Sequence, residues 1–143
     1  MRGKIFVDTN ILVYCFDSAD PTKKKRANQV VEQLWEGSNG VLSLQVLKEF
    51  FVTVTGKLAT KMTFRDARAA VLDLLSWDIF YENRASLEKT FEIFQRHHLS
   101  FWDANILSSA ILSGCDRIYS EDLQHSRTIE DVKILNPFLI NGG

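Results

Sequence analysis

Cysteine and proline are both scarce in this sequence, which contains two of each among 143 residues. Cys15 and Cys115 lie far apart in apolar sequence, without the spacing of a metal site, so we expect free, buried thiols and no disulfide. A reducing, cytoplasmic setting fits that pattern. No hydrophobic run reaches membrane-spanning length, and Asp8 interrupts the first one, so we expect neither a membrane span nor a secretory leader.

Neither sign of charge dominates, because the sequence has 17 Lys and Arg residues and 18 Asp and Glu residues, for a formal net charge of −1. Bulk charge therefore argues neither for nor against a nucleic-acid partner. The basic residues gather in three short runs, at residues 23–26, at Lys57, Lys61, Arg65 and Arg68, and at residues 96–98. Such runs are usually solvated helix faces, and they become informative only beside a site that handles phosphates.

Several signatures of catalysis are also missing. The sequence has no cluster of His or Cys residues with zinc spacing, no glycine-rich phosphate loop and no nucleophile elbow. Its three histidines are scattered in polar sequence. Carboxylates are therefore the side chains left to carry chemistry.

The hydrophobic pattern alternates short β-type runs with amphipathic helical stretches. Strands are expected at residues 5–7, 41–44, 78–82, 117–120 and 132–135. Helices are expected at about residues 9–16, 21–36, 46–54, 64–75, 85–97 and 101–112. This alternation predicts an α/β fold, a three-layer α/β/α sandwich with a mostly parallel central sheet of four or five strands. We expect residues 1–143 to form a single domain.

Two acids directly follow predicted strands. Asp8 lies between the strand at residues 5–7 and the next helix, and Asp122 follows the strand at residues 117–120. Ligand sites in open α/β sheets lie beyond the carboxyl ends of the strands, so both acids are placed to meet a substrate or a metal. Each alone would also fit a helix cap or a turn.

Two further acids lie on the inner edges of helices. Glu49 is on the shoulder of the apolar face that begins at Val46, and Asp103 continues the inward face of Ile106. A capping box with Ser100 is the alternative explanation for Asp103. Clustered carboxylates repel one another, but a hard divalent cation among them makes the cluster tolerable, and an all-oxygen site favours Mg²⁺ or Mn²⁺.

Four segments, in order, resemble the PIN-domain nucleases, above all the VapC-type toxins of bacterial and archaeal toxin–antitoxin operons. They are VDTNILVY around Asp8, the mid-chain Glu49, FWDANI around Asp103, and YSEDLQH followed by KILNPF. The resemblance covers nearly the whole chain. It implies a PIN fold and a Mg²⁺-dependent endoribonuclease activity that leaves a 5′-phosphate, with Mn²⁺ as an alternative metal. It also implies a VapB-like antitoxin that inhibits the enzyme, and a homodimer.

The resemblance also implies roles for individual residues. It implies an acidic quartet of Asp8, Glu49, Asp103 and Asp122. Asp8 and Asp103 would hold the metal directly, and the other two directly or through water, with Glu121 competing with Asp122 for its place. Hydrogen-bonding support would come from Thr9, Asn10 and Ser120. Separately from the resemblance, Lys57, Lys61 and Arg65 fall just after the helix of Glu49, and we expect them to contact the RNA backbone.

Two other functions fit parts of the pattern. One is a catalytically silent PIN-like module that binds RNA or a protein, against which the complete quartet argues. The other is an aspartyl-nucleophile phosphatase, which needs a second acid where this sequence has Asn10. Surplus aromatic residues near the first helices predict a groove for an antitoxin helix, lined by some of Tyr14, Phe16, Trp35, Phe50 and Phe51. The alternative is that all five belong to the hydrophobic core.

Overall fold

A six-stranded sheet forms the centre of the computed structural model, which describes residues 3–140. The strands are β1 (Ile5–Val7), β2 (Gly40–Ser43), β3 (Asp78–Phe80), β4 (Arg117–Tyr119), β5 (Thr128–Ile129) and β6 (Val132–Leu135). Their order across the sheet is β3-β2-β1-β4-β6-β5. Every neighbouring pair is parallel except β5 with β6, which confirms the predicted mostly parallel α/β fold.

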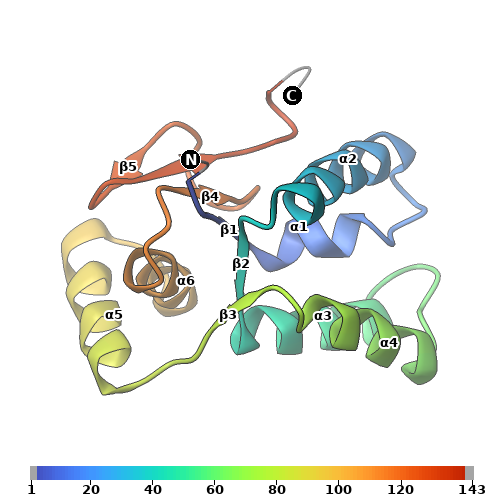
Figure 1. Ribbon diagram of the computed structural model, residues 1–143, viewed down its shortest axis with the longest axis horizontal. Helices are drawn as coiled ribbons and strands as arrows, with labels where there is room; N and C mark the ends of the chain where they lie inside the picture. The colour runs from blue at the N-terminus through green and yellow to red at the C-terminus, as the bar shows by residue number, and fades with distance from the viewer. Residues whose placement is uncertain (1–2, 141–143) are drawn as a thin grey trace.

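Helices cover both faces of this sheet. They are α1 (Thr9–Tyr14), α2 (Pro21–Gly37), α3 (Leu44–Gly56), α4 (Phe64–Leu74), α5 (Arg84–His97) and α6 (Phe101–Leu112). The steps from β1 to β2 to β3 run in one direction, so right-handed crossovers place α1 to α4 on one face. The chain then returns across the sheet to β4, which places α5 and α6 on the opposite face (Figure 1).

The strand count of four or five was wrong, because β5 is a sixth strand. It has only two residues and pairs antiparallel with β6 through the two-residue turn Glu130-Asp131, both with positive φ. A strand that short leaves no alternating pattern in the sequence. Ser43 ends β2 one residue earlier than expected, because its hydroxyl accepts the N–H of Val46 and starts α3.

The helix starts follow their polar caps. Side chains of Asp20, Thr63 and Ser100 each accept a backbone N–H in the first turn of α2, α4 and α6. Cys15 and Cys115 are free and buried as predicted, and burial raises the pKa of these thiols to about 12 and about 11. None of the helices within residues 3–140 combines the length and apolar character that crossing a membrane requires.

The neighbours β1 and β4 define the point where the topology changes direction. From β1 the chain proceeds toward β2, whereas from β4 it proceeds to β6 on the other side. The crevice beyond the carboxyl ends of two such strands is where α/β sheets bind ligands. Val7 pairs with Tyr119, and the Asp8 N–H extends the ladder to the Tyr119 carbonyl at 2.9 Å. Asp8 and Ser120 therefore leave the sheet side by side.

Candidate active site

Asp8 is a carboxylate held at the end of a fully buried strand, and its own side chain is only 6% exposed. It is the N-cap of α1, and its Oδ1 accepts the N–H of Thr9 at 2.7 Å. Its Oδ2 accepts the Ser120 hydroxyl at 2.7 Å and the Asn10 amide at 3.3 Å. The capping role and a ligand role are therefore compatible, because the cap uses one oxygen and leaves lone pairs on both.

Burial is the largest cause that raises the pKa of Asp8, from 3.8 to about 6. The hydrogen bonds from Ser120 and Thr9 oppose this rise, while the nearby negative charges of Asp122 and Asp103 add to it. Within residues 3–140, no lysine, arginine or histidine forms an ion pair with any acid of the predicted quartet. The negative charge of the site thus lacks a cationic partner from the described chain.

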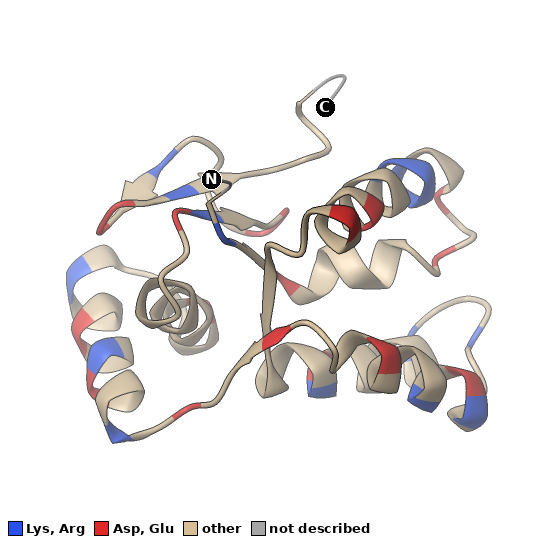
Figure 2. Ribbon diagram, viewed as in Figure 1, with Lys and Arg blue, Asp and Glu red and all other residues tan. Residues whose placement is uncertain are grey.

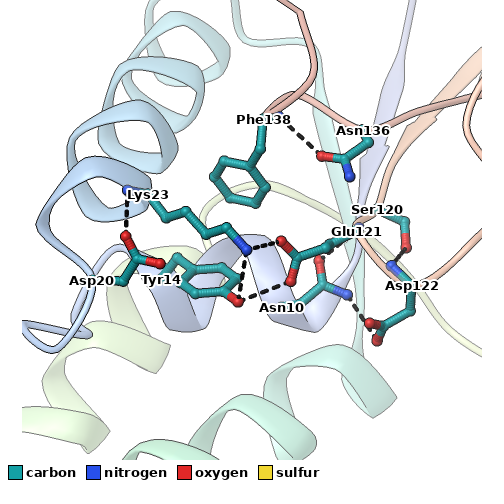
Figure 3. A network of polar contacts seen from close by, with 9 residues as sticks. All are labelled: Asn10, Tyr14, Asp20, Lys23, Ser120, Glu121, Asp122, Asn136 and Phe138. Carbon is teal, nitrogen blue, oxygen red and sulfur yellow. Dashed lines mark hydrogen bonds and ion pairs between the residues drawn. The ribbon is translucent and has the colours of Figure 1, made fainter.

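Asn10 links the acids that follow the two strands. Its Nδ2 donates to Oδ2 of Asp8 at 3.3 Å, and its Oδ1 accepts the N–H of Glu121 at 3.1 Å. The same Nδ2 donates to Oδ2 of Asp122 at 3.1 Å (Figure 3). Because the backbone N–H binds the amide oxygen, the NH₂ group has to face the two carboxylates. Asn10 therefore brings Asp122 beside Asp8.

Glu49 is tied to the same place from α3. Its Oε2 accepts the Thr9 hydroxyl at 3.0 Å, and its Oε1 accepts the Gln45 amide at 2.8 Å. The Gln45 amide is itself oriented by the buried Asn105 of α6, which donates to its Oε1. Hydrogen bonds thus connect the helices that carry Glu49 and Asp103, although these helices lie on opposite faces of the sheet.

Asn105 is the centre of that connection and makes three polar contacts. Its Nδ2 donates to Gln45 and, at 2.7 Å, to Glu82, and its Oδ1 accepts the Thr90 hydroxyl at 2.9 Å. Sequence reasoning missed both Gln45 and Asn105, although each lies close to a predicted acid along its helix. A buried amide whose donors and acceptor are all used holds its neighbours in one geometry.

Asp103 lies half-buried in the first turn of α6. The Ser100 hydroxyl accepts its backbone N–H at 3.1 Å, so half of the predicted capping box forms. The carboxylate of Asp103, however, accepts no hydrogen bond from any other side chain or backbone group within the described residues. It remains available to a ligand.

All four predicted acids line one pocket, with a volume of about 680 Å³. Thr9 and Asn10 line it too, while Ser120 lies buried behind Asp8. The pocket also contains Lys48, Lys57 and Trp102. Of these, sequence reasoning selected only Lys57, although Lys48 and Trp102 each directly precede an acid of the quartet. Exposed Lys61 and Arg65 lie outside the lining of this pocket.

The donor set suits a hard divalent cation. It consists of four carboxylates and neighbouring amide and hydroxyl oxygens, the ligand types of Mg²⁺ and Mn²⁺. Within residues 3–140, no three Asp, Glu, His or Cys side chains lie in this geometry so that together they could hold a metal ion. Hydrogen bonds instead engage carboxylate oxygens: Asp8 accepts them from Asn10 and Ser120, and Glu49 accepts them from Thr9 and Gln45. The four acids fit such an ion by their donor chemistry and by lining one pocket.

Glu121, the competitor of Asp122, also lines the pocket, but its carboxylate is already engaged by other side chains. Its carboxylate accepts the Tyr14 hydroxyl at 2.8 Å and pairs with the ammonium of Lys23 at 2.5 Å (Figure 3). That ammonium also lies 4.9 Å from the ring centre of Tyr14 and 5.4 Å from that of Phe138. The charge of Glu121 is thus already compensated, whereas Asp122 faces Asn10 and the other acids.

The surplus aromatic residues divide between core and surface. Phe50 is completely buried, so it lines no groove. Phe51 does line a groove, between α3 and α4, with a volume of about 380 Å³ and mostly apolar walls. Trp35 and Phe16 are partly exposed and pack against Trp77 and Phe50.

Comparison with known proteins supports the fold described above. The model of the PIN domain family matches residues 5–130. A chain from a toxin–antitoxin complex of Klebsiella pneumoniae superposes with a TM-score of 0.71 at 20% identity, covering 94% of this chain and 98% of that one. VapC20 of Mycobacterium tuberculosis, a toxin that cleaves the sarcin–ricin loop, superposes at 0.64 with 23% identity, covering 83% and 90%. None of the curated proteins matches the sequence significantly.

The raised pKa of Asp8 predicts a pH-dependent stability. Between 3.8 and about 6 the folded state binds this proton more tightly than the unfolded state, so the free energy of unfolding falls as pH rises through that window. The loss amounts to about 3 kcal/mol, at about 1.4 kcal/mol per pKa unit. In EDTA, Asp8→Asn should therefore be more stable than wild type near pH 7, and the difference should vanish near pH 4.

Urea denaturation across this pH range measures the effect. Asp73→Asn, a change on the exposed side of α4, is the matched control and should follow wild type throughout. An Asp8→Asn difference that stays constant with pH would contradict the assigned burial cost.

Proposed function

Because this chain belongs to the PIN-domain family, we propose that it is a metal-dependent endoribonuclease and the toxin of a VapBC-type toxin–antitoxin pair. One observation carries the proposal: four carboxylates from two strand ends and two helices line one pocket, with no cationic side chain of the described residues paired to them. We further propose that residues 1–143 are a single PIN domain, and that the protein works in the reducing cytoplasm, where its two free thiols are stable.

The chain's own residues prepare the site for hydrolysis of a phosphodiester. Asp8 and Asp103 would hold Mg²⁺ or Mn²⁺ directly, and Glu49 and Asp122 directly or through water. When bound, such an ion supplies the positive charge that activates a water and neutralises phosphate. Ser120 and the Thr9 N–H favour the ionised form of Asp8, which is the form that binds a cation. The cleavage would leave a 5′-phosphate, as the family likeness implies.

The amide side chain of Asn10 argues against the phosphatase alternative. That chemistry needs a second carboxylic acid there, but the Asn10 NH₂ group faces Asp8 and Asp122 as a donor. The neighbour VapC20 cleaves an RNA loop, which supports RNA as the substrate class. The complete quartet in one pocket supports a cutting enzyme over a silent module.

Replacing single acids should separate these functions. Asp8→Asn or Asp103→Asn removes a charged metal ligand and should lower Mg²⁺-dependent RNA cleavage by about a hundredfold or more, since even changes beyond the direct ligands cost 10–100-fold. Asp122→Asn should lose clearly more activity than Glu121→Gln, because Lys23 and Tyr14 engage Glu121. Cleavage of single-stranded RNA with Mg²⁺, Mn²⁺ or EDTA is the measurement.

The control for this series is Asp73→Asn on α4, which should cleave like wild type. Full activity of wild type in EDTA would refute metal dependence, and full activity of Asp8→Asn would refute the site. Absence of cleavage with any RNA and either metal would favour the silent module.

Basic residues near the pocket would hold the RNA backbone. Lysine and arginine recur along α3, α4 and the loop between them (Figure 2). Lys48 and Lys57 line the acidic pocket, whereas Lys61 and Arg65 lie farther along the same exposed stretch. Lys57 is thus the best supported of the three residues that the sequence suggested, and Lys48 joins it.

This arrangement predicts a ranked salt dependence. Each phosphate contact to single-stranded nucleic acid contributes about 0.7 to the slope of log affinity against log salt. Lys48→Gln with Lys57→Gln should therefore reduce the slope by about 1.4. Lys61→Gln with Arg65→Gln should reduce it less. Filter binding in EDTA at several salt concentrations measures both, and equal slopes in the two double variants would contradict the ranking.

An antitoxin is the proposed partner. The Klebsiella neighbour comes from a toxin–antitoxin complex, which supports a VapB-like inhibitor here. The apolar groove between α3 and α4 suits the apolar face of an amphipathic helix. Lys48 and Val52 line both this groove and the acidic pocket, so the two are contiguous. A basic residue on that helix would reach the unpaired carboxylates. We also propose a homodimer, on family likeness alone.

Co-expression with the small reading frame beside its gene tests the groove. The two proteins should co-purify and RNA cleavage should be suppressed. Leu72→Glu places a charge in the groove and should weaken co-purification at least tenfold while the isolated protein still cleaves RNA. Leu87→Glu, at an equally exposed leucine on α5 outside the groove, should change neither. Equal effects of the two variants would place the partner elsewhere.

A further inference from the structure

We propose that Trp102 is a stacking platform for a nucleobase at the mouth of the acidic pocket. The substrate class is then single-stranded RNA with an unstacked base beside the cleaved phosphate. This inference rests on the proposed nuclease function and adds to it how the RNA is held.

The first observation is the position of the indole. Trp102 is 60% exposed, although it is a large apolar side chain, and it lines the pocket together with all four acids. It directly precedes Asp103 in the first turn of α6. If a phosphate of RNA lies at the four acids, the base of the same or a neighbouring nucleotide would lie near the exposed indole of Trp102.

The second observation is that the exposed ring is braced. The Phe101 ring lies edge-on to it at 5.3 Å and 85°, and Phe101 in turn contacts Phe91 at 5.8 Å and Phe94 at 6.3 Å. The Ser100 cap holds the helix turn that carries both residues. A ring already held in place loses little conformational entropy when a base stacks on it.

The third observation is the composition of the pocket. Proteins that bind single strands combine positive charges along the backbone with aromatic faces for the bases. Lys48 and Lys57 supply the charges here, and Trp102 supplies the face. In duplex RNA each base is already stacked on both sides, so a loop, bulge or free strand is the form that Trp102 accepts.

The neighbouring phenylalanines suggest another use, a protein-binding surface. Phe91 and Phe94 are also exposed, but neither lines the pocket. Trp102 alone among these exposed rings shares the pocket with the acids. The observations therefore favour RNA for Trp102, and loss of protein binding becomes one outcome of the test.

The test measures binding of a short single-stranded RNA in EDTA, where no metal supports cleavage. Trp102→Ala should weaken binding about tenfold or more, and Trp102→Phe should weaken it less because a smaller ring still stacks. Trp35→Phe is the matched control. Trp35 is 41% exposed, lies on α2 outside the pocket and should change nothing.

RNA with an abasic nucleotide, placed in turn at each position, supplies the second arm. At one position the abasic RNA should bind wild type about as weakly as intact RNA binds Trp102→Ala, and combining both changes should cost no more than either alone. The measurements with wild-type protein do not depend on any variant folding correctly. They also identify which base stacks on Trp102.

Each outcome bears on one proposal. Equal binding of intact RNA by wild type and Trp102→Ala, or additive losses in the combined arm, would overturn the stacking proposal even if wild type cleaves RNA. Trp102-dependent binding by a protein that cleaves nothing would refute the nuclease and support stacking. A Trp102→Ala variant that loses only its co-purifying partner would show a protein-binding surface and overturn the proposal.

Discussion

The burial of one negative charge is the constraint on which the rest of this structure depends. Asp8 ends a strand that lies wholly inside the protein, and three neighbouring donors, from Thr9, Asn10 and Ser120, compensate its carboxylate only in part. Burial raises the pKa of Asp8, and the hydrogen bonds from Ser120 and Thr9 oppose this rise only in part. The ionised carboxylate therefore costs stability, and a cation bound beside it, as proposed, would offset part of that cost.

The second constraint is that the acids must stay together although they repel. Two come from loops after adjacent parallel strands, and the others come from helices on opposite faces of the sheet. Amides perform most of this work: Asn10 connects the two strand ends, and Gln45 with Asn105 connects the two helices. Amides donate and accept without adding charge, so they hold carboxylates in place without neutralising them.

The two exposed features around the pocket, the α3–α4 groove and Trp102, suit different partners. The α3–α4 groove is apolar and joins the acidic pocket at Lys48 and Val52, which suits a partner that covers both. Trp102 is within the pocket itself, where RNA would lie. If antitoxin and RNA compete for this region, inhibition needs no conformational change, because one bound molecule excludes the other.

Much of the fold and the acids of the site were predictable from the sequence alone. Hydrophobic periodicity and caps such as Ser100 depend on neighbours a few residues away, so α6 and β6 were predicted to the residue. The acids at the strand ends followed from the general rule about parallel sheets. Only the tertiary structure decided that Asn10 binds Asp122 while Lys23 and Tyr14 engage Glu121, and that Asn105 orients Gln45. Those facts depend on side-chain directions and on contacts between residues 60 and more positions apart, which no local pattern records.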